Sequence, residues 1–339
     1  QKLAVRVIKF VVSIFTVVGV IKILDTRYSE SAPAREVTFG NYGPVECEDK
    51  FKSTLAENLN VVKNYPRGTA DEFMWKIGGN LSAPDDIPKF PVIVTAIDSL
   101  HYPESMGLFR SIHQGIMGNR KYSGLLKTKC RCEVRSFPFT ELPEHVRTKE
   151  TFAFKPIIIQ ILLVEFGFVC WVDASIRFTT PDIDVGIQFA IDNSLLFYVR
   201  RDVSKSYTIA RQTDSKTFTF LKEDVCKFRN FTELVGGFLM FHYDTVSKVI
   251  VNAWASCALN KQCISPDKTP LKPECNLRHT QDGRCHKFDQ SVLSILIRHV
   301  IHDTNEYPPD RQLDTIFEIR KNEIDNYFEN CNPILKCYS

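Results

Sequence analysis

The sequence predicts an α/β fold in which a mostly parallel sheet carries helices on both faces and follows a membrane-anchor helix. Three observations predict it. Short apolar runs of strand length alternate with longer helix-like stretches along residues 90–303. The 339 residues include 44% apolar and 24% charged residues, which is ordinary globular usage and excludes disordered, collagenous and coiled-coil proteins. A separate apolar run lies near the amino end.

The amino-terminal apolar run, FVVSIFTVVGVI, covers residues 10–21 and is flanked by basic residues. Twelve helical residues span about 18 Å, less than the ~30 Å hydrocarbon core, but flanking lysines can snorkel and lengthen the span. The preceding positive charges favour a cytosolic amino end and a lumenal remainder. Residues 1–24 are therefore predicted to form a type II signal anchor. A cleaved signal peptide, giving a secreted protein, and a buried helix are the alternatives.

Three segments follow the predicted anchor. Residues 25–88 are polar and interrupted by Pro and Gly, which predicts a stem or irregular collar. Residues 89–330 carry the strand and helix patterns and are predicted to form the lumenal domain, and residues 331–339 are predicted to be a tail.

The cysteines and glycosylation signals favour an oxidising secretory compartment, the Golgi or the endoplasmic reticulum. The chain has 11 cysteines and carries acceptor sequons at Asn80 and Asn230. Cys170 lies inside a predicted buried strand and is expected to be a free thiol, which leaves ten cysteines for up to five disulfides. The alternative is a zinc site, built from Cys263, Cys275, Cys285 and His286.

Strands are expected at the short apolar runs of the domain and helices at its longer apolar stretches. The predicted strands are 91–98, 130–139, 168–172, 194–200 and 236–244, and the predicted helices are 104–117, 155–166, 245–259 and 289–303. Pro156 and Gly167 suit the first turn and the end of one helix, and Asp289 is placed to cap the last. Ligands of such sheets bind outside the carboxyl ends of the strands, so we expect the site there.

Asp173 directly follows the predicted strand 168–172. A carboxylate held there could bind a divalent cation and, through it, a diphosphate. The alternative is an Asp that only ends the strand by bonding turn amides. His286 could be a second metal ligand beside Asp173, because imidazole and carboxylate both suit Mn²⁺.

Two further motifs could contact a ligand. Gly236 and Gly237 begin a predicted strand, where a backbone without side chains could let a ligand approach closely. The alternative is a turn or bulge that binds no ligand. Asp289 and Gln290 begin the last helix and offer acceptor and donor groups suited to sugar hydroxyls.

The cations closest to these motifs in the sequence are Lys155, Arg177 and Lys287. Each is a candidate for binding phosphate, and a solvated surface charge is the alternative. The 43 Lys and Arg against 40 Asp and Glu form no basic block, so nucleic acid is not an expected partner. The signatures of P-loop nucleotidases, dinucleotide-dependent dehydrogenases and serine hydrolases are missing from the sequence.

The order of these motifs resembles the GT-A class of nucleotide-sugar glycosyltransferases, and FKPIIIQ, WVDASIRF and HKFDQSVL resemble an uncharacterised family called domain of unknown function 1647. The resemblance covers about residues 90–330 and implies a GT-A-like, Rossmann-like fold. It implies that Asp173 binds the nucleotide and a Mn²⁺ or Mg²⁺ ion. It also implies that Gly236, Gly237, Asp289 and Gln290 surround the donor sugar.

Ser175 departs from the GT-A pattern, because it stands where the motif has its second carboxylate. The residues expected to be catalytic are Asp173, Asp289 and Gln290. Those expected to contact the bound cofactor are Ser175, Lys155, Arg177 and Lys287, together with the two glycines.

The expected function is metal-assisted transfer of a sugar from a nucleotide-sugar donor to a glycan or glycoprotein acceptor. Breaking a glycosyl–phosphate bond requires charge stabilisation on the leaving diphosphate, which a cation and nearby Lys or Arg can provide. One alternative is a catalytically inactive glycan-binding or scaffold module of the same fold. Another is a methyltransferase that uses S-adenosylmethionine, although residues 95–100, TAIDSL, lack the glycine-rich loop that it would need.

Overall fold

The computed structural model describes residues 47–78, 81–82, 84–98, 100–116, 135–137, 139–199, 207–266, 275, 281–303, 308, 313 and 315–327. The predicted anchor (1–24), the predicted tail (331–339) and most of the predicted strand 130–139 lie outside these residues. Within the described ranges, none of the helices combines the length and hydropathy that crossing a bilayer requires.

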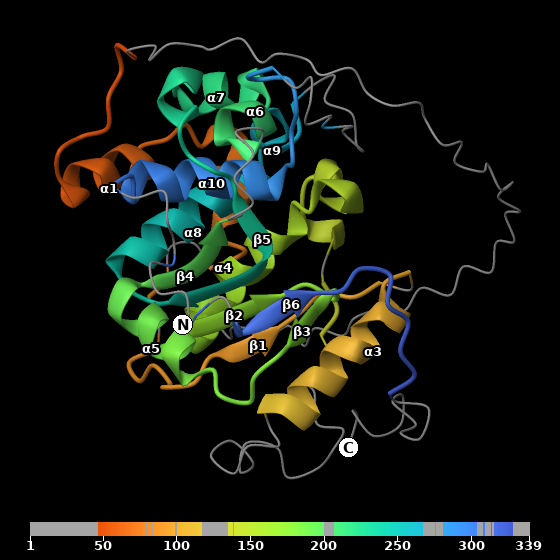
Figure 1. Ribbon diagram of the computed structural model, residues 1–339. Coiled ribbons are helices and arrows are strands. Elements are labelled where there is room, and N and C mark those ends of the chain that lie inside the picture. The colour runs from red at the N-terminus through yellow and green to blue at the C-terminus, as the bar shows by residue number, and fades with distance from the viewer. Residues whose placement is uncertain are drawn as a thin grey trace, which may run out of the picture.

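A four-stranded sheet forms the centre of the molecule (Figure 1). Its order is β1 (Val92–Val94), β2 (Phe168–Val172), β5 (Leu234–His242) and β4 (Leu195–Val199). Only β1 and β2 are parallel, whereas β5 runs antiparallel to both of its neighbours. The prediction of a mostly parallel sheet is therefore wrong. Strands covered on both faces are apolar whatever their direction, so their composition did not reveal the orientation of β5.

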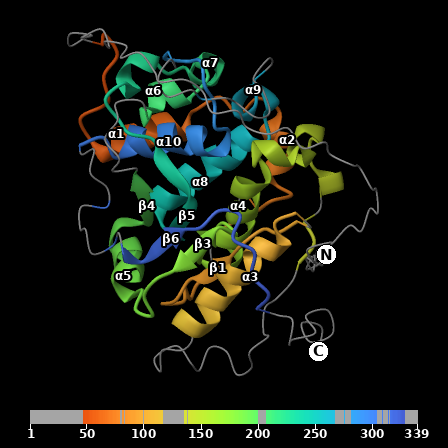
Figure 2. The ribbon, with the colours of Figure 1, turned by 45° about the vertical axis from the view of Figure 1, so that its right-hand side comes forward.

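Side chains of β2 alternate between two hydrophobic clusters, one on each face of the sheet. Val169 and Trp171 belong to the larger cluster, and Phe168, Cys170 and Val172 belong to the smaller one. The larger cluster includes residues of α4 (Phe154–Phe166), α8 (Thr245–Ala258) and α10 (Asp289–Val300). The smaller cluster includes residues of α3 (Tyr102–Arg110) and α5 (Asp184–Asn193). Helices thus cover both faces, as predicted (Figure 2).

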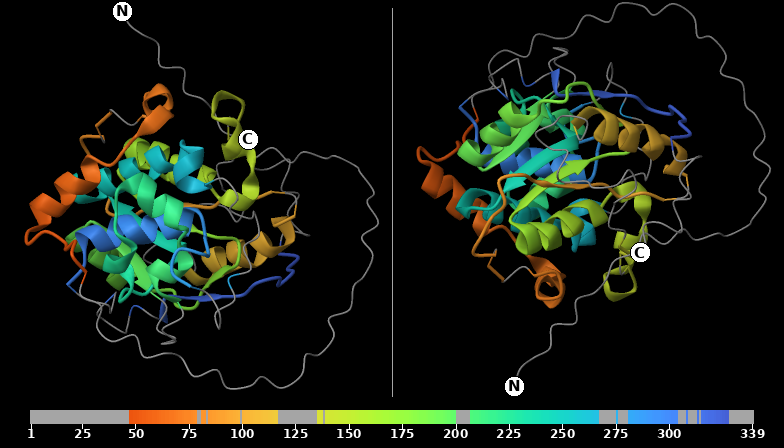
Figure 3. Two further views of the ribbon diagram at one scale, coloured as in Figure 1. Left: turned by 90° about the horizontal axis from the view of Figure 1, so that it is seen from above. Right: turned by 90° about the horizontal axis from the view of Figure 1, so that it is seen from below.

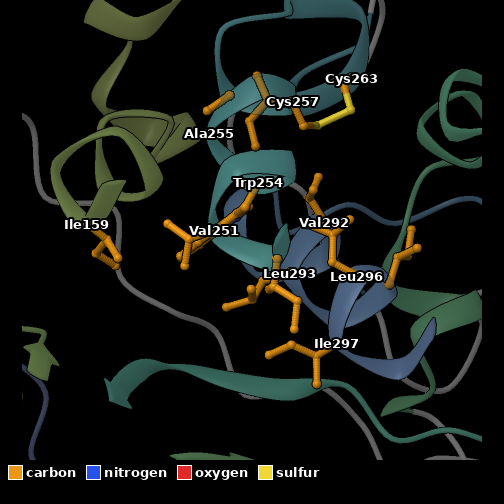
Figure 4. Packing of buried hydrophobic residues seen from close by; sticks show 14 of the residues in the cluster. Ile159, Val251, Trp254, Ala255, Cys257, Cys263, Val292, Leu293, Leu296 and Ile297 are labelled. Carbon is orange, nitrogen blue, oxygen red and sulfur yellow. A yellow bond between two sulfur atoms is a disulfide. The ribbon is translucent and has the colours of Figure 1, made fainter. Parts of the chain in front are cut away.

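The sheet's larger cluster is closed by α8 and α10, which pack against each other. Val251 and Trp254 of α8 lie close to Val292, Leu293 and Leu296 of α10 (Figure 4). Asp244 caps α8 through a reciprocal capping box with Ser247.

The ends of the two other helices near the site follow from local chemistry. α4 has Pro156 in its first turn and ends at Gly167, whose φ of 73° is a left-handed conformation that glycine adopts without strain. The N-cap of α10 is Phe288, with φ 50°, so Asp289 is the first helical residue and its predicted capping role is wrong. The Lys287 amide instead donates to Ser291 Oγ at 2.8 Å.

Helices are also present within the predicted stem, residues 25–88. Here α1 (Leu55–Lys63) starts with a capping box of Thr54 and Glu57, and α2 (Asp71–Met74) follows it. Val62 and Met74 are buried in the same cluster as the sheet. In Figure 3 this part of the chain is orange and lies at the edge of the molecule.

The remaining elements are short. They are η1 (Gly68–Ala70), the π-helical η2 (Ser111–Ile116) that continues α3, η4 (Phe139–Glu141), η5 (Glu144–Arg147), η6 (Lys149–Thr151), α6 (Ile209–Gln212), α7 (Ser215–Leu221), η8 (Val225–Phe228) and α9 (Lys261–Ile264). A second sheet pairs β3 (Ile176–Phe178) with β6 (Phe317–Ile319).

Three disulfides lie within the described residues: Cys47–Cys226, Cys257–Cys263 and Cys275–Cys285. Cys170 is a buried free thiol, as predicted, and burial raises its pKa far above the ordinary range. The alternative zinc site is wrong, because all three of its cysteines are in disulfides.

Candidate functional site

One buried ammonium group joins the predicted motifs. Lys155, the second residue of α4, is only 3% exposed. Its Nζ lies 3.2 Å from Asp173 Oδ1 and 3.2 Å from Asp289 Oδ2, and it donates to the Gly236 carbonyl at 3.1 Å. The structure therefore brings together the carboxylate after β2, the glycines of β5 and the start of α10.

Aromatic rings and carboxylates keep this ammonium charged. Lys155 Nζ lies 5.4 Å from the ring centroids of both Phe152 and Trp171, within the range of cation–π attraction. Burial by itself would lower the pKa of Lys155. The charges of Asp173 and Asp289 outweigh burial and raise that pKa above its ordinary value.

Asp173 presents one carboxylate oxygen at the edge of this cluster. Its backbone amide donates to the Gly237 carbonyl at 2.8 Å, which continues the pairing of β2 with β5. Oδ1 accepts from the Trp171 indole at 2.8 Å, and the side chain is 37% exposed. A Cβ added to Gly237 would lie 3.1 Å from Oδ2, so the missing side chain at Gly237 keeps open the space beside this oxygen.

Asp289 shares the Lys155 ammonium with Asp173 and is 3% exposed. Burial raises the pKa of Asp289 to about 6, because desolvation and the negative charge of Asp173 together outweigh the attraction of Lys155. The Trp254 indole donates to the Asp289 carbonyl at 2.9 Å, which fixes the start of α10 against α8.

Gln290 connects α10 to the glycine strand. Its Oε1 accepts from the Gly236 amide at 3.1 Å, and a Cβ on Gly236 would lie 3.2 Å from the same oxygen. This close approach explains the glycine, while the half-buried amide of Gln290 retains two N–H donors on Nε2.

Two predicted phosphate ligands are bonded to other protein groups. Buried Arg177 donates from Nη1 to the Ala174 carbonyl at 2.7 Å and from Nη2 to the Glu104 carbonyl at 3.0 Å. These bonds tie the turn after β2 to α3. Lys287 donates to Glu233 Oε2 at 2.6 Å.

His286 lies in surroundings other than those predicted for it, whereas Ser175 lies in the turn after β2. The Nε2 atom of His286 lies 2.9 Å from the Ile264 carbonyl, and Nδ1 accepts from the Asp214 amide at 3.3 Å. Both ring nitrogens are thus engaged by the backbone, and burial lowers the pKa of His286 to about 4. The Ser175 carbonyl accepts from the Arg320 amide at 2.8 Å, which joins this turn to the segment after β6.

A divalent cation would find one accessible carboxylate here. No group of three His, Cys, Asp or Glu residues among the described parts of the chain is arranged to hold a metal. Magnesium is often bound by one or two carboxylates together with phosphate oxygens of the substrate. Asp173 Oδ2, above the open space at Gly237, suits that mode of binding and not a cage made only of protein ligands.

The predicted motifs do not include Trp171 and Trp254, whose indoles hydrogen-bond to Asp173 and Asp289. Trp171 was detectable, because residues two apart on a strand share a face and its indole could reach Asp173. Trp254 is 35 residues from Asp289 in sequence, and no local pattern links them.

The chain matches no protein-family model, and it has no detectable similarity to curated proteins or to solved structures.

Proposed function

We propose that the chain is a glycosyltransferase-like protein of GT-A type that binds a nucleotide sugar at the end of β2. The acceptor is a glycan or glycoprotein. The observation that carries the proposal is the convergence on Lys155 of Asp173, Gly236 and Asp289 from three distant parts of the chain. The motifs that resemble the GT-A class are thereby the groups that meet in space.

The roles follow from exposure. Asp173 would hold a Mn²⁺ or Mg²⁺ ion together with the donor diphosphate, and the ion would offset the charge that develops on the leaving group. Gly236 and Gly237 leave room for the donor beside that carboxylate. The N–H donors of Gln290 suit a sugar hydroxyl.

Lys155 and Asp289 serve as positioning residues in this proposal, because both are almost completely buried. Lys155 holds Asp173 Oδ1 and so directs Oδ2 of the same carboxylate toward the open space at Gly237. A fixed carboxylate loses less freedom on binding than a mobile one, which favours affinity.

A catalytically inactive glycan-binding module is the second candidate. Ser175 replaces the second carboxylate, and the described residues provide no three-ligand metal site. Such a module would keep the contacts to a sugar and need no metal.

The compartment that we propose is the lumen of the Golgi or endoplasmic reticulum, with residues 1–24 as the membrane anchor. The three disulfides support an oxidising compartment.

Calorimetry with the full chain in mild detergent tests the function. A panel of UDP-, GDP- and CMP-sugars would be titrated with and without Mn²⁺, using the wild type, Asp173→Asn, Gly237→Ala and the exposed control Asp85→Asn. We expect Mn²⁺-dependent binding of one nucleotide class that both variants weaken about tenfold or more. Asp173→Asn removes a charge-assisted contact, and Gly237→Ala fills the space beside Asp173 Oδ2. The control should bind like the wild type.

Three outcomes are informative. Metal-independent binding of free glycans without nucleotide binding would favour the inactive module. Equal affinity of Asp173→Asn and wild type for every donor would refute the proposed site. Donor hydrolysis or transfer by the wild type, abolished in Asp173→Asn, would establish the enzyme.

A further inference from the structure

A cavity of about 500 Å³ lies between the end of α1, the turn after it and one face of α8. Lys248, Asn252 and Ser256 follow one another at helical spacing along that face. Trp254 of the same helix instead donates to Asp289. The cavity and the candidate site therefore lie on different sides of α8.

The charge around this cavity is of one sign. Its lining includes Lys63, Arg67 and Lys248, and it includes no Asp or Glu. Arg67 pairs with Asp71 at 2.7 Å, so the two lysines supply the uncompensated part of the positive charge. In a chain with nearly equal numbers of acidic and basic residues, such a lining favours anions.

Apolar side chains also line the cavity. Val62, Val249 and Ala253 provide this apolar surface. Ser256 is a further lining residue, and its Oγ is buried.

An adjoining cavity of about 300 Å³ shares Tyr65 with the 500 Å³ cavity, and its lining includes Glu223. Lys227 Nζ lies 2.6 Å from Glu223 Oε2, and His299 Nδ1 lies 2.9 Å from Glu223 Oε1. Tyr65 also donates to this carboxylate. The negative charge of Glu223 is thus locally paired and offers little repulsion to an anion in the larger cavity.

From these features we infer that the cavity beside α8 binds a small organic anion, in which a phosphate or carboxylate is carried on a compact apolar body. Lys63 and Lys248 contact the anionic group, and the aliphatic side chains contact the apolar body. The volume is within the range of small-molecule sites. This site is separate from the proposed nucleotide-sugar site and does not depend on it.

Calorimetry with the full chain at low ionic strength tests the inference, with phenyl phosphate and benzoate as probes and phenol and inorganic phosphate as controls. We expect saturable binding of at least one of the two probes. The probe that binds more tightly shows whether the site prefers a phosphate or a carboxylate. Phenol and inorganic phosphate should each bind about tenfold more weakly, or not at all, because each lacks one half of the recognised chemistry.

Variants assign the binding to this cavity. Lys63→Ala with Lys248→Ala should weaken the probe about tenfold or more, and added NaCl should weaken it in the wild type. The control Lys89→Ala with Lys321→Ala removes the same charge from exposed positions outside the cavity and should leave affinity unchanged. A thermal melt of each variant checks that it remains folded.

Several results would overturn the inference. They are the absence of saturable binding by both probes, equal binding of phenol, and equal losses in the cavity and control variants. Asp173→Asn should bind the probe like the wild type. A loss there would show that the probe occupies the candidate site, whereas failure of nucleotide-sugar binding alone would leave this site supported.

Discussion

Replacing Asp289 with Asn tests the electrostatics of the Lys155 cluster directly. Asn has almost the same shape as Asp but does not ionise, so the change removes one buried negative charge and little else. Asp289 is 3% exposed, and burial raises its pKa in the folded protein to about 6. In an unfolded chain an Asp pKa is about 3.9.

The sign of the effect follows from these two pKa values. Between pH 4 and pH 6 the folded state keeps a proton on Asp289 that the unfolded state has released. The proton on Asp289 therefore stabilises the folded state fully below about pH 4, and this stabilisation is lost as pH rises through about 6. The difference corresponds to about 3 kcal/mol in the free energy of unfolding. Asp289→Asn should equal the wild type near pH 4 and exceed it by about 3 kcal/mol near pH 7.5.

The ionisation of His286 also makes stability depend on pH, so Asp289→Asn must be compared with the wild type at each pH. Burial lowers its pKa to about 4, so its ionisation destabilises the folded state as pH falls through the range from 6.5 to 4. This dependence opposes that of Asp289 and is present in both proteins, so it cancels in their difference.

The assay is equilibrium denaturation of the full chain with its disulfides intact, at several pH values between 4 and 7.5. Asp85→Asn, at an exposed position, is the matched control and should show no such trend. A stability difference between Asp289→Asn and wild type that stays constant with pH would refute the reasoning. It would mean that the Asp289 carboxyl is solvated or remains protonated throughout.

Two further predictions concern the amino-terminal disulfide and the described sequon. Replacing Cys47 and Cys226 with Ala removes a cross-link between residues 179 apart and should lower the free energy of unfolding by about 2–5 kcal/mol, measured by chemical denaturation. An unchanged midpoint would contradict it. Asn230 is exposed in the turn after η8, so secretory expression should attach a glycan there. Asn230→Gln should increase gel mobility as endoglycosidase treatment does, and identical mobility of variant and wild type would exclude the modification.

Local patterns were sufficient for several elements around the site. The run FVCWV forms β2 with its predicted bounds, and Gly167 ends α4 in the left-handed conformation expected after a helix. The burial of Cys170 followed from the same run. These features depend on neighbouring residues, and a one-dimensional pattern contains that information.

Long-range geometry decided the rest. The apolar run of β5 is compatible with either strand direction, and only pairing with β2 and β4 made it antiparallel. Arg177 and His286 could have met a ligand, but distant backbone groups bind them instead. Arg177 donates to the Glu104 carbonyl, and His286 contacts the Ile264 carbonyl and the Asp214 amide.

By itself, the sequence determined where the central strand ends and that Asp173 follows it, because burial and turn formation depend on adjacent residues. Only the tertiary structure decided that Lys155 lies between Asp173 and Asp289. Attraction between charges acts across space, and residues 134 positions apart in the chain become neighbours only when the core packs.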